Sequence, residues 1–233
     1  MIQPRMHTQP ARIGPYTVLE AIGRGGSGAV YRAHDQRLQR DVAIKVLVSQ
    51  DDSTQADRFL REARAASALN HPNILTIHDV VTDVAPPYIV TELVMGRTLR
   101  QVVDTGPVPL ARIIDLATQL ADGLAAAHAA GLVHRDLKPE NVMVTQEGRV
   151  KILDFGLSRY AAGTTDDTNQ HTITAAHVVH GTAPYMSPEH ARGLHVDARS
   201  DLFSFGVILY ELAYRLSPFH RATTIDTLAA IIH

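Results

Sequence analysis

The stretch His134-Arg-Asp-Leu-Lys-Pro-Glu-Asn141, followed by Asp154-Phe-Gly156, decides how this chain folds. It places an acid, a lysine and an amide in one short segment, with a second acid one hairpin later. Two short β-prone runs, Val142–Thr145 and Val150–Leu153, lie between the motifs, so both motifs fall on loops. Polar side chains gathered on short loops indicate a functional site rather than part of a core.

The side chains in these two motifs are those needed to move a phosphoryl group onto a hydroxyl. Asp136 can accept the hydroxyl proton, and Lys138 can neutralise charge on the moving phosphate. Asn141 and Asp154 can hold Mg²⁺, a hard cation that prefers oxygen ligands. The two motifs at this spacing therefore predict phosphoryl transfer.

A glycine-rich segment near the amino terminus, Gly23-Arg-Gly25-Gly-Ser-Gly28-Ala-Val30, fits the pattern G-x-G-x-x-G-x-V. Missing side chains let backbone amides approach phosphates closely. Glycine-rich hairpin turns are common, so the segment alone is a weak signal. Because it falls between two predicted strands, it favours a flap over a nucleotide and not a dinucleotide fold.

Lys45 ends the otherwise apolar run Val42-Ala-Ile-Lys45 and is the predicted phosphate contact. The alternative is a solvent-facing lysine on an edge strand. Glu62, in the middle of a predicted helix, is the best acidic partner for Lys45. Neighbouring arginines could instead claim Glu62 in surface ion pairs, which contribute little to stability.

Composition excludes several other classes of protein. The net charge is −2 over 233 residues, so neither nucleic-acid nor membrane-surface binding is indicated. The chain has no cysteine, which excludes disulfides and thiolate chemistry, and its 13 histidines show no metal-ligand spacing. A lone His134 is more often a packed core residue than a metal ligand. We find no signal peptide and no membrane-spanning run, and we expect a cytoplasmic location.

The order of predicted elements indicates an α+β fold with a β-rich part followed by a helical part. Residues 1–11 are predicted to be flexible, 12–95 to form the first lobe and 96–233 the second, with a linker near Glu92–Gly96. The predicted strands are Tyr16–Ile22, Ala29–His34, Arg40–Val48, Ile74–Val81 and Tyr88–Leu93, and the predicted helices are Thr54–Leu69, Leu110–Ala130, Arg199–Arg215 and Thr223–Ile232. Gly163–His180 is polar and unpatterned, so a mobile loop is expected there.

These motifs, in this order and closed by Gly181-Thr-Ala-Pro-Tyr-Met-Ser-Pro-Glu189, resemble the eukaryotic-like protein kinases, most closely the bacterial serine/threonine kinases. The resemblance implies a bilobal fold with ATP in the cleft. It places Gly23, Gly25 and Gly28 over the phosphates and Lys45, steadied by Glu62, on the α- and β-phosphates. The residues implied around adenine are Thr91 as gatekeeper, Glu92 and Val94 through their backbones, and Val30, Ala43 and Met143 against the ring.

The same resemblance implies the substrates and the regulation. Lys138, two residues after Asp136, is typical of serine/threonine kinases, so proteins with Ser or Thr hydroxyls are the expected substrates. Arg135 and Arg159 could grip a phosphothreonine, with Thr172 and Thr174 as the best candidates. Phosphate on these residues implies self-association for trans-autophosphorylation.

The chain departs from the family pattern at its carboxyl end. It stops at His233, whereas the family usually continues with further helices, including an arginine that pairs with the equivalent of Glu189. We therefore expect a helical lobe without its last helices and a chain that looks truncated. This departure favours one alternative to a kinase, a pseudokinase or nucleotide-binding scaffold, although every catalytic side chain is present. A small-molecule phosphotransferase of related fold is a third option, but the glycine-rich segment and the segment at Pro188-Glu189, which the motif order marks as a substrate-docking shelf, favour protein substrates.

Overall fold

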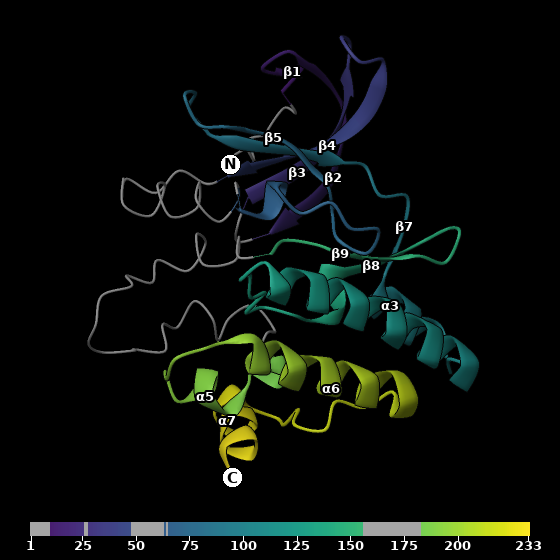
Figure 1. The fold of residues 1–233 in the computed structure, drawn as a ribbon, viewed down its shortest axis with the longest axis vertical. Helices are drawn as coiled ribbons and strands as arrows, with labels where there is room; N and C mark the ends of the chain where they lie inside the picture. The colour runs from purple at the N-terminus through teal and green to yellow at the C-terminus, as the bar shows by residue number, and fades with distance from the viewer. Residues whose placement is uncertain (1–9, 26–27, 48–62, 64, 156–182) are drawn as a thin grey trace, which may run out of the picture. The chain divides into compact units, whose positions relative to one another are not determined.

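The computed structural model describes residues 10–25, 28–47, 63, 65–155 and 183–233 (Figure 1). The chain divides into two compact units. Unit 1 comprises Met1–Asp51 and Ile77–Leu93, and unit 2 comprises Asp52–Thr76 and Val94–His233.

Several predicted features lie outside the described residues. They are Glu62 with most of the predicted helix Thr54–Leu69, Arg159, and the loop Gly163–His180 that carries Thr172 and Thr174. Ala63 and residues 65–67 are helical, and Ala63 and Ala66 are buried.

Unit 1 is built on one antiparallel sheet of six strands in the order β1-β2-β3-β4-β6-β5. Its strands are β1 (Arg12–Ile13), β2 (Tyr16–Gly25), β3 (Gly28–Asp35), β4 (Arg40–Leu47), β5 (Ile77–Val81) and β6 (Tyr88–Glu92). The β2–β3 hairpin contains the glycine-rich segment. The sheet confirms the β-rich first part predicted from short runs separated by turn residues.

Alternation of side chains explains which face of this sheet is buried. In β4, Val42 and Ile44 are completely buried, whereas their neighbours Asp41, Ala43 and Lys45 are only partly buried. Successive side chains of a strand point to opposite faces, so Val42 and Ile44 share the core face. They pack in a cluster with Ala33 of β3 and with Tyr88 and Val90 of β6. The opposite face of β4 is left to Ala43 and Lys45.

Unit 2 combines a small sheet with helices. The sheet has the order β7-β8-β9, with β7 at Gly96–Thr98, β8 at Val142–Thr145 and β9 at Val150–Ile152. The α-helices are α2 (Leu99–Thr105), α3 (Leu110–Ala129), α5 (Pro188–Ala191), α6 (Ala198–Tyr214) and α7 (Thr224–Ile232), and the 3-10 turns are η1 (Pro139–Asn141) and η3 (Ala183–Tyr185). The helices confirm the predicted α+β fold class.

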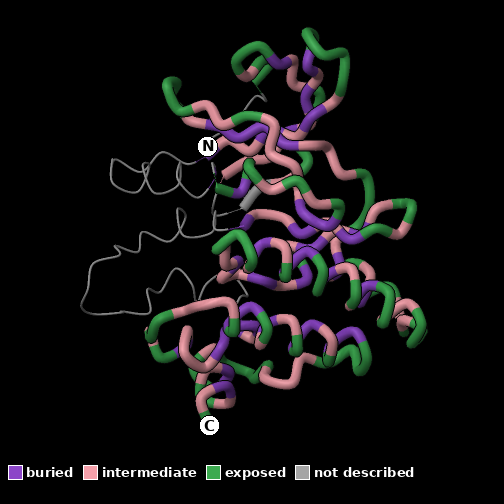
Figure 2. The backbone as a smooth tube through the Cα atoms, viewed as in Figure 1, coloured by how far each residue is buried: buried purple, intermediate pink, exposed green. Residues whose placement is uncertain are grey.

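The long helix α3 anchors unit 2. Leu116, Leu120 and Leu124 recur every fourth residue and are buried, which places them on one face of the helix. That face packs against β9 and α6, and buried and exposed positions alternate along both helices in Figure 2. Among the described residues, no helix has the length and apolar character needed to cross a membrane.

Two features of unit 2 differ from the sequence expectation. Strand β7 and helix α2 were not predicted, because β7 has only three residues and α2 only seven. Helix α6 agrees with the sequence, whose apolar residues predict a helix packed in a helical lobe with part of its apolar surface left open. The structure buries Val207, Ile208 and Leu212 but leaves Leu202 55% exposed and Tyr210 43% exposed. Helix α6 therefore has one buried stripe and one exposed stripe.

Candidate active site

The strand register in unit 1 gathers the predicted nucleotide-binding residues on one face of the sheet. Gly23 pairs with Val30, and Val30 pairs with Lys45. Ala43, two residues before Lys45, pairs with Thr91. Residues directly opposite in an antiparallel pair point to the same face, as do residues two apart in one strand. These five positions therefore line one face, the one opposite to Val42 and Ile44.

The fold requires glycine at some positions of the β2–β3 hairpin but not at others. Gly28 has a φ of 135°, and a Cβ there would collide with the carbonyl oxygen of Val46 on β4. The fold itself thus requires glycine at position 28. A Cβ on Gly23 would meet Val30 at 3.8 Å, an ordinary contact, so nothing in the sheet requires glycine there. Gly25 pairs with Gly28 at the end of β2.

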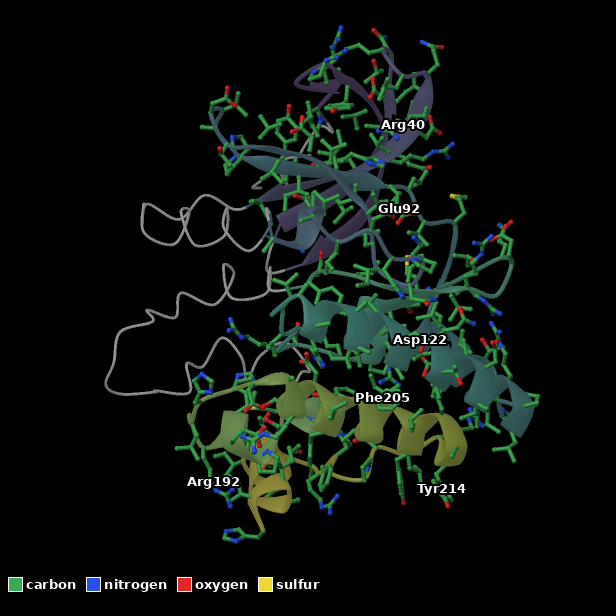
Figure 3. The ribbon with its side chains drawn as sticks, in the orientation of Figure 1. Arg40, Glu92, Asp122, Arg192, Phe205 and Tyr214 are labelled. Atoms are coloured by element: carbon green, nitrogen blue, oxygen red, sulfur yellow. The ribbon has the colours of Figure 1, made fainter. Side chains whose placement is uncertain are left out.

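Residues at the end of β6 and just beyond it are the predicted adenine contacts. Thr91 is buried, and its hydroxyl donates to the carbonyl oxygen of Glu92 at 3.1 Å. Glu92, labelled in Figure 3, is the last residue of β6 and pairs with Val42 of β4. In unit 2, Val94 and Met143 are partly buried, and Met143 pairs with Thr98 and Lys151 in the small sheet.

The turn of residues 134–141, called the catalytic turn after its predicted role, brings three predicted residues into direct contact. The Lys138 ammonium lies 3.0 Å from Asp136 Oδ2. The amide of Asn141 donates to the Asp136 carbonyl oxygen at 2.8 Å and to the Asp136 carboxylate at 3.1 Å. Asp136 and Lys138 are partly buried, with side chains 17% and 14% exposed. The turn thus holds a carboxylate in a fixed place beside one cation and one amide.

His134 joins this turn to the segment that carries Asp154. Its ring is fully buried, as predicted for a core histidine, and Nε2 donates to the Leu153 carbonyl oxygen at 2.8 Å. Nδ1 accepts from the Asp136 backbone N–H at 3.3 Å, so one tautomer satisfies both bonds. The Leu153 N–H in turn donates to the Asn141 carbonyl oxygen at 2.8 Å. Asp154 therefore follows a residue that is tied to both ends of the catalytic turn.

Two residues of the site have left-handed backbone conformations. Arg135 has a φ of 66° and Asp154 a φ of 56°. Such conformations are unfavourable for residues other than glycine and persist where the surroundings fix them. The hydrogen bonds of His134 and Leu153 supply part of that constraint.

Asp201 of α6 holds the start of the catalytic turn through backbone hydrogen bonds, a role that the sequence did not predict. Its carboxylate is 1% exposed and accepts the backbone N–H groups of His134 at 2.7 Å and Arg135 at 2.9 Å. His128 Nε2, at the end of α3, donates to the same carboxylate at 2.8 Å. A buried charge is rare unless it is paired or hydrogen-bonded. An acid in an otherwise apolar helix was the signal that could have revealed it.

The donor set of the site suits a hard divalent cation. The Asn141 amide nitrogen donates to Asp136, which leaves the side-chain oxygen of Asn141 pointing away from Asp136. That oxygen and the Asp154 carboxylate are the ligand types that Mg²⁺ prefers. The described residues contain no group of three or more His, Asp or Glu side chains arranged for a metal. A cation here would need the remaining ligands from phosphate and water.

The segment from η3 to α5 includes Glu189 and is where the order of the motifs predicts a shelf for substrate docking. Glu189 was expected to need a cationic partner. Its carboxylate instead accepts a short hydrogen bond from the Ser200 hydroxyl, and Arg199 acts on it only through longer-range electrostatics. Burial alone would raise the pKa of Glu189, but hydrogen bonds from Ser200, its own backbone and Ser187 lower it below the usual value. Part of the carboxylate faces solvent, so hydrogen bonds stabilise its charge without an ion pair within the described residues.

Comparison with known proteins finds a matching family and several relatives, all of them protein kinases. The protein kinase domain family matches residues 16–233. A probable serine/threonine-protein kinase of Streptomyces coelicolor is 47% identical over 220 residues, which cover 91% of this chain and 32% of that protein. Serine/threonine-protein kinase PknB of Mycobacterium leprae is 44% identical over 222 residues, covering 92% of this chain and 35% of PknB.

A third relative, serine/threonine-protein kinase PknL of Mycobacterium tuberculosis, is 42% identical over 207 residues, covering 88% of this chain and 50% of PknL. The chain thus spans 32% to 50% of the length of these three relatives. The matches confirm the resemblance predicted from the order of the motifs.

Proposed function

Because this chain belongs to the protein kinase domain family, we propose that it transfers the γ-phosphate of ATP to serine and threonine hydroxyls of proteins. The observation that carries the proposal is the contact of Asp136 with Lys138 and Asn141 in one rigid turn. The relatives that match most of the chain are named serine/threonine-protein kinases. The position of Lys138, two residues after Asp136, agrees with serine/threonine specificity.

The catalytic turn would act on the incoming hydroxyl. Asp136 accepts its proton as the oxygen attacks phosphorus, and the Asn141 amide keeps the carboxylate oriented. Lys138 sits against the same carboxylate, from which it can neutralise charge on the transferred phosphate. Little of the rate enhancement in phosphoryl transfer comes from covalent chemistry, so positioning of these groups is the main contribution of the protein.

ATP would bind to the face of the unit 1 sheet that carries Val30, Ala43 and Lys45. Gly23, Gly25 and Gly28 would cover the phosphates with backbone N–H groups, and Lys45 would contact the α- and β-phosphates. Glu62, the proposed partner of Lys45, lies outside the described residues. Around adenine we assign the roles that the family implies to Val30, Ala43, Thr91, Glu92, Val94 and Met143.

Mg²⁺ is the expected metal cofactor, held by Asn141 and Asp154. When bound, it neutralises phosphate charge and orients the transferred group. The fit of these two residues rests on their oxygen donors and on the bond between the Leu153 N–H and the Asn141 carbonyl, which fixes the two segments together. A kinase that uses Mg-ATP would work in the cytoplasm, where ATP is abundant.

Phosphorylation of the chain on itself is a further part of the proposal. Phosphate on Thr172 or Thr174 adds about two negative charges, which Arg135 and Arg159 can bind. Mass spectrometry after incubation with Mg-ATP should find phosphate within residues 163–180. Full activity without phosphate there, and no loss in a Thr172→Ala/Thr174→Ala variant, would remove this mechanism.

A labelling experiment tests the function itself. The chain is incubated with γ-labelled Mg-ATP and a generic protein substrate, and the labelled product is hydrolysed to amino acids. We expect phosphoserine and phosphothreonine. Label found only on a small molecule, or nucleotide binding without any transfer, would favour the phosphotransferase or the scaffold alternative instead.

A further inference from the structure

Arg100, on the first turn of α2, makes more polar contacts than any role assigned so far requires. Its Nε lies 2.9 Å from Glu140 Oε1, and one terminal nitrogen lies 2.8 Å from Glu211 Oε1. The other terminal nitrogen donates to Glu211 Oε2 at 3.3 Å and, in a short bond, to the Tyr185 hydroxyl. The Tyr185 hydroxyl also donates to Glu211 Oε2 at 2.5 Å. All three guanidinium nitrogens are therefore engaged.

Apart from Asp104, which lies 3.8 Å from one terminal nitrogen and only four residues on in α2, the partners of Arg100 come from segments far apart in the sequence. Glu140 belongs to the catalytic turn, Tyr185 to η3 at the start of the proposed shelf, and Glu211 to α6. They are 40, 85 and 111 residues from Arg100, and all four residues belong to unit 2. One guanidinium thus connects the catalytic turn, the shelf and the central helix. A planar fork with fixed donor directions suits this task better than the compact ammonium of lysine.

Helix α2 holds the base of Arg100 in place. Thr98 caps the helix by accepting the Gln101 N–H, and the Gln101 side chain accepts the Thr98 N–H in return. Leu99, next to Arg100, is 1% exposed. The capping box around Arg100 and the burial of Leu99 beside it leave its backbone little freedom. The guanidinium is therefore presented from a fixed support.

Burial divides the network into a core and an exposed arm. Tyr185 is 4% exposed and the Glu211 side chain 8%, whereas the Glu140 side chain is 46% exposed. Burial, followed by the bond to Glu211, raises the pKa of Tyr185, so its hydroxyl stays protonated as a donor. The pair of Arg100 and Glu211 therefore serves the fold, while the arm to Glu140 reaches the catalytic turn.

Glu140 immediately precedes Asn141, the residue whose amide orients the Asp136 carboxylate. A shift of η1 would move the Asn141 amide and therefore the proton acceptor. We propose that Arg100 is a positioning residue that holds the catalytic turn in register with the substrate shelf through Glu140 and Tyr185. This inference rests on the proposed kinase function, since it assigns Arg100 a role in the same reaction.

Two mild substitutions test the network, and one of them, Glu140→Gln, leaves the buried bonds of Arg100 to Glu211 and Tyr185 in place. Arg100→Lys keeps the charge and loses the fork, and Glu140→Gln cuts only the exposed arm. The substrate is a peptide with no charged residue near its acceptor serine or threonine. Each variant should lower the kcat for this peptide by about tenfold, since small misplacements of reacting groups are costly. The KM for ATP should change little. Arg112→Lys is the matched control, because the hydrogen bonds of Arg112 within the described residues go to Asp115 and the Gly148 carbonyl oxygen and not to residues 134–141.

The double variant Arg100→Lys/Glu140→Gln shows whether Arg100 acts through Glu140 or whether the two residues affect kcat independently. If Arg100 acts through Glu140, the double variant should also lose only about tenfold in kcat, because contacting residues are not additive. A loss of about a hundredfold, or unchanged kcat per folded molecule with only a lower melting temperature, would overturn the proposal.

Hydrogen exchange separates this inference from the proposed function. The backbone N–H groups of residues 136–138 and 140–142 should exchange faster in both single variants than in the wild type and in Arg112→Lys. Faster exchange with a wild type that transfers no phosphate would support the positioning and refute the kinase function. Unchanged exchange in both variants would refute the positioning, whatever the activity.

Discussion

Replacement of Asp201 by asparagine should uncouple the catalytic turn from α6. The aspartate uses Oδ2 for the His134 N–H and the His128 ring, and Oδ1 for the Arg135 N–H. An asparagine has one oxygen for these two positions. If the oxygen takes the position with two donors, the amide nitrogen faces the Arg135 N–H, and two donors confront each other.

The expected loss in stability follows from this geometry. A hydrogen bond to a charged group contributes about 1.5–3 kcal/mol, and a buried N–H without an acceptor costs a similar amount, so we expect a loss of about 3 kcal/mol. That is a large share of the roughly 5–15 kcal/mol that stabilises a typical domain. Activity should fall as well, since the bonds that hold residues 134 and 135 are those that weaken.

Urea unfolding of the 233-residue chain measures the effect. Asp122→Asn on α3 is the control, because the same chemical change is made at an exposed helix position (Figure 3). The control should stay within about 0.5 kcal/mol of the wild type, as is usual for surface substitutions. If Asp201→Asn were equally mild and kept full turnover, the anchoring role of Asp201 would be refuted.

Two further predictions concern the glycine-rich hairpin and the shelf. Gly23→Ala should fold normally but raise the KM for ATP, because the sheet does not require glycine there and its proposed role is to let the backbone approach the phosphates. Gly28→Ala should destabilise unit 1 through the clash with Val46. Melting curves and KM values that did not separate the two variants would contradict this. Ser200→Ala removes the largest contribution that lowers the pKa of Glu189. Because a lowered pKa adds stability above the unfolded value of 4.5 and loses it as pH falls, the stability gap between wild type and Ser200→Ala should be present at neutral pH and shrink in acid. A gap independent of pH, measured by thermal melts across that range, would remove the charged carboxylate from the explanation.

The parts of the fold that could be predicted are those with a repeating apolar pattern along the sequence. The strands of unit 1 alternate apolar residues between glycine and polar turns, and α3 repeats leucine every fourth residue, so both were predicted with small errors at their ends. Helix α2 has no such repeat, because it has seven residues, although Thr98 and Gln101 form a capping box that could have revealed it.

The residues of the site divide in the same way. Asp136, Lys138 and Asn141 lie in one short motif, so their contact follows from sequence proximity. Arg100 and Glu211 are 111 residues apart, and their pairing depends on how α2 and α6 pack. No local pattern carries that information, which is why the network around Arg100 emerged only from the structure.

The most direct test of the central claim compares wild type with Asp136→Asn at saturating Mg-ATP. The substitution keeps the shape of the side chain and removes the proton acceptor, so the rate of transfer to serine and threonine should fall at least about a hundredfold. Nucleotide affinity, measured by calorimetry, should stay close to that of the wild type, because Asp136 is not among the proposed phosphate contacts. Turnover by Asp136→Asn at the wild-type rate, or a wild type that binds nucleotide and transfers no phosphate, would contradict the account.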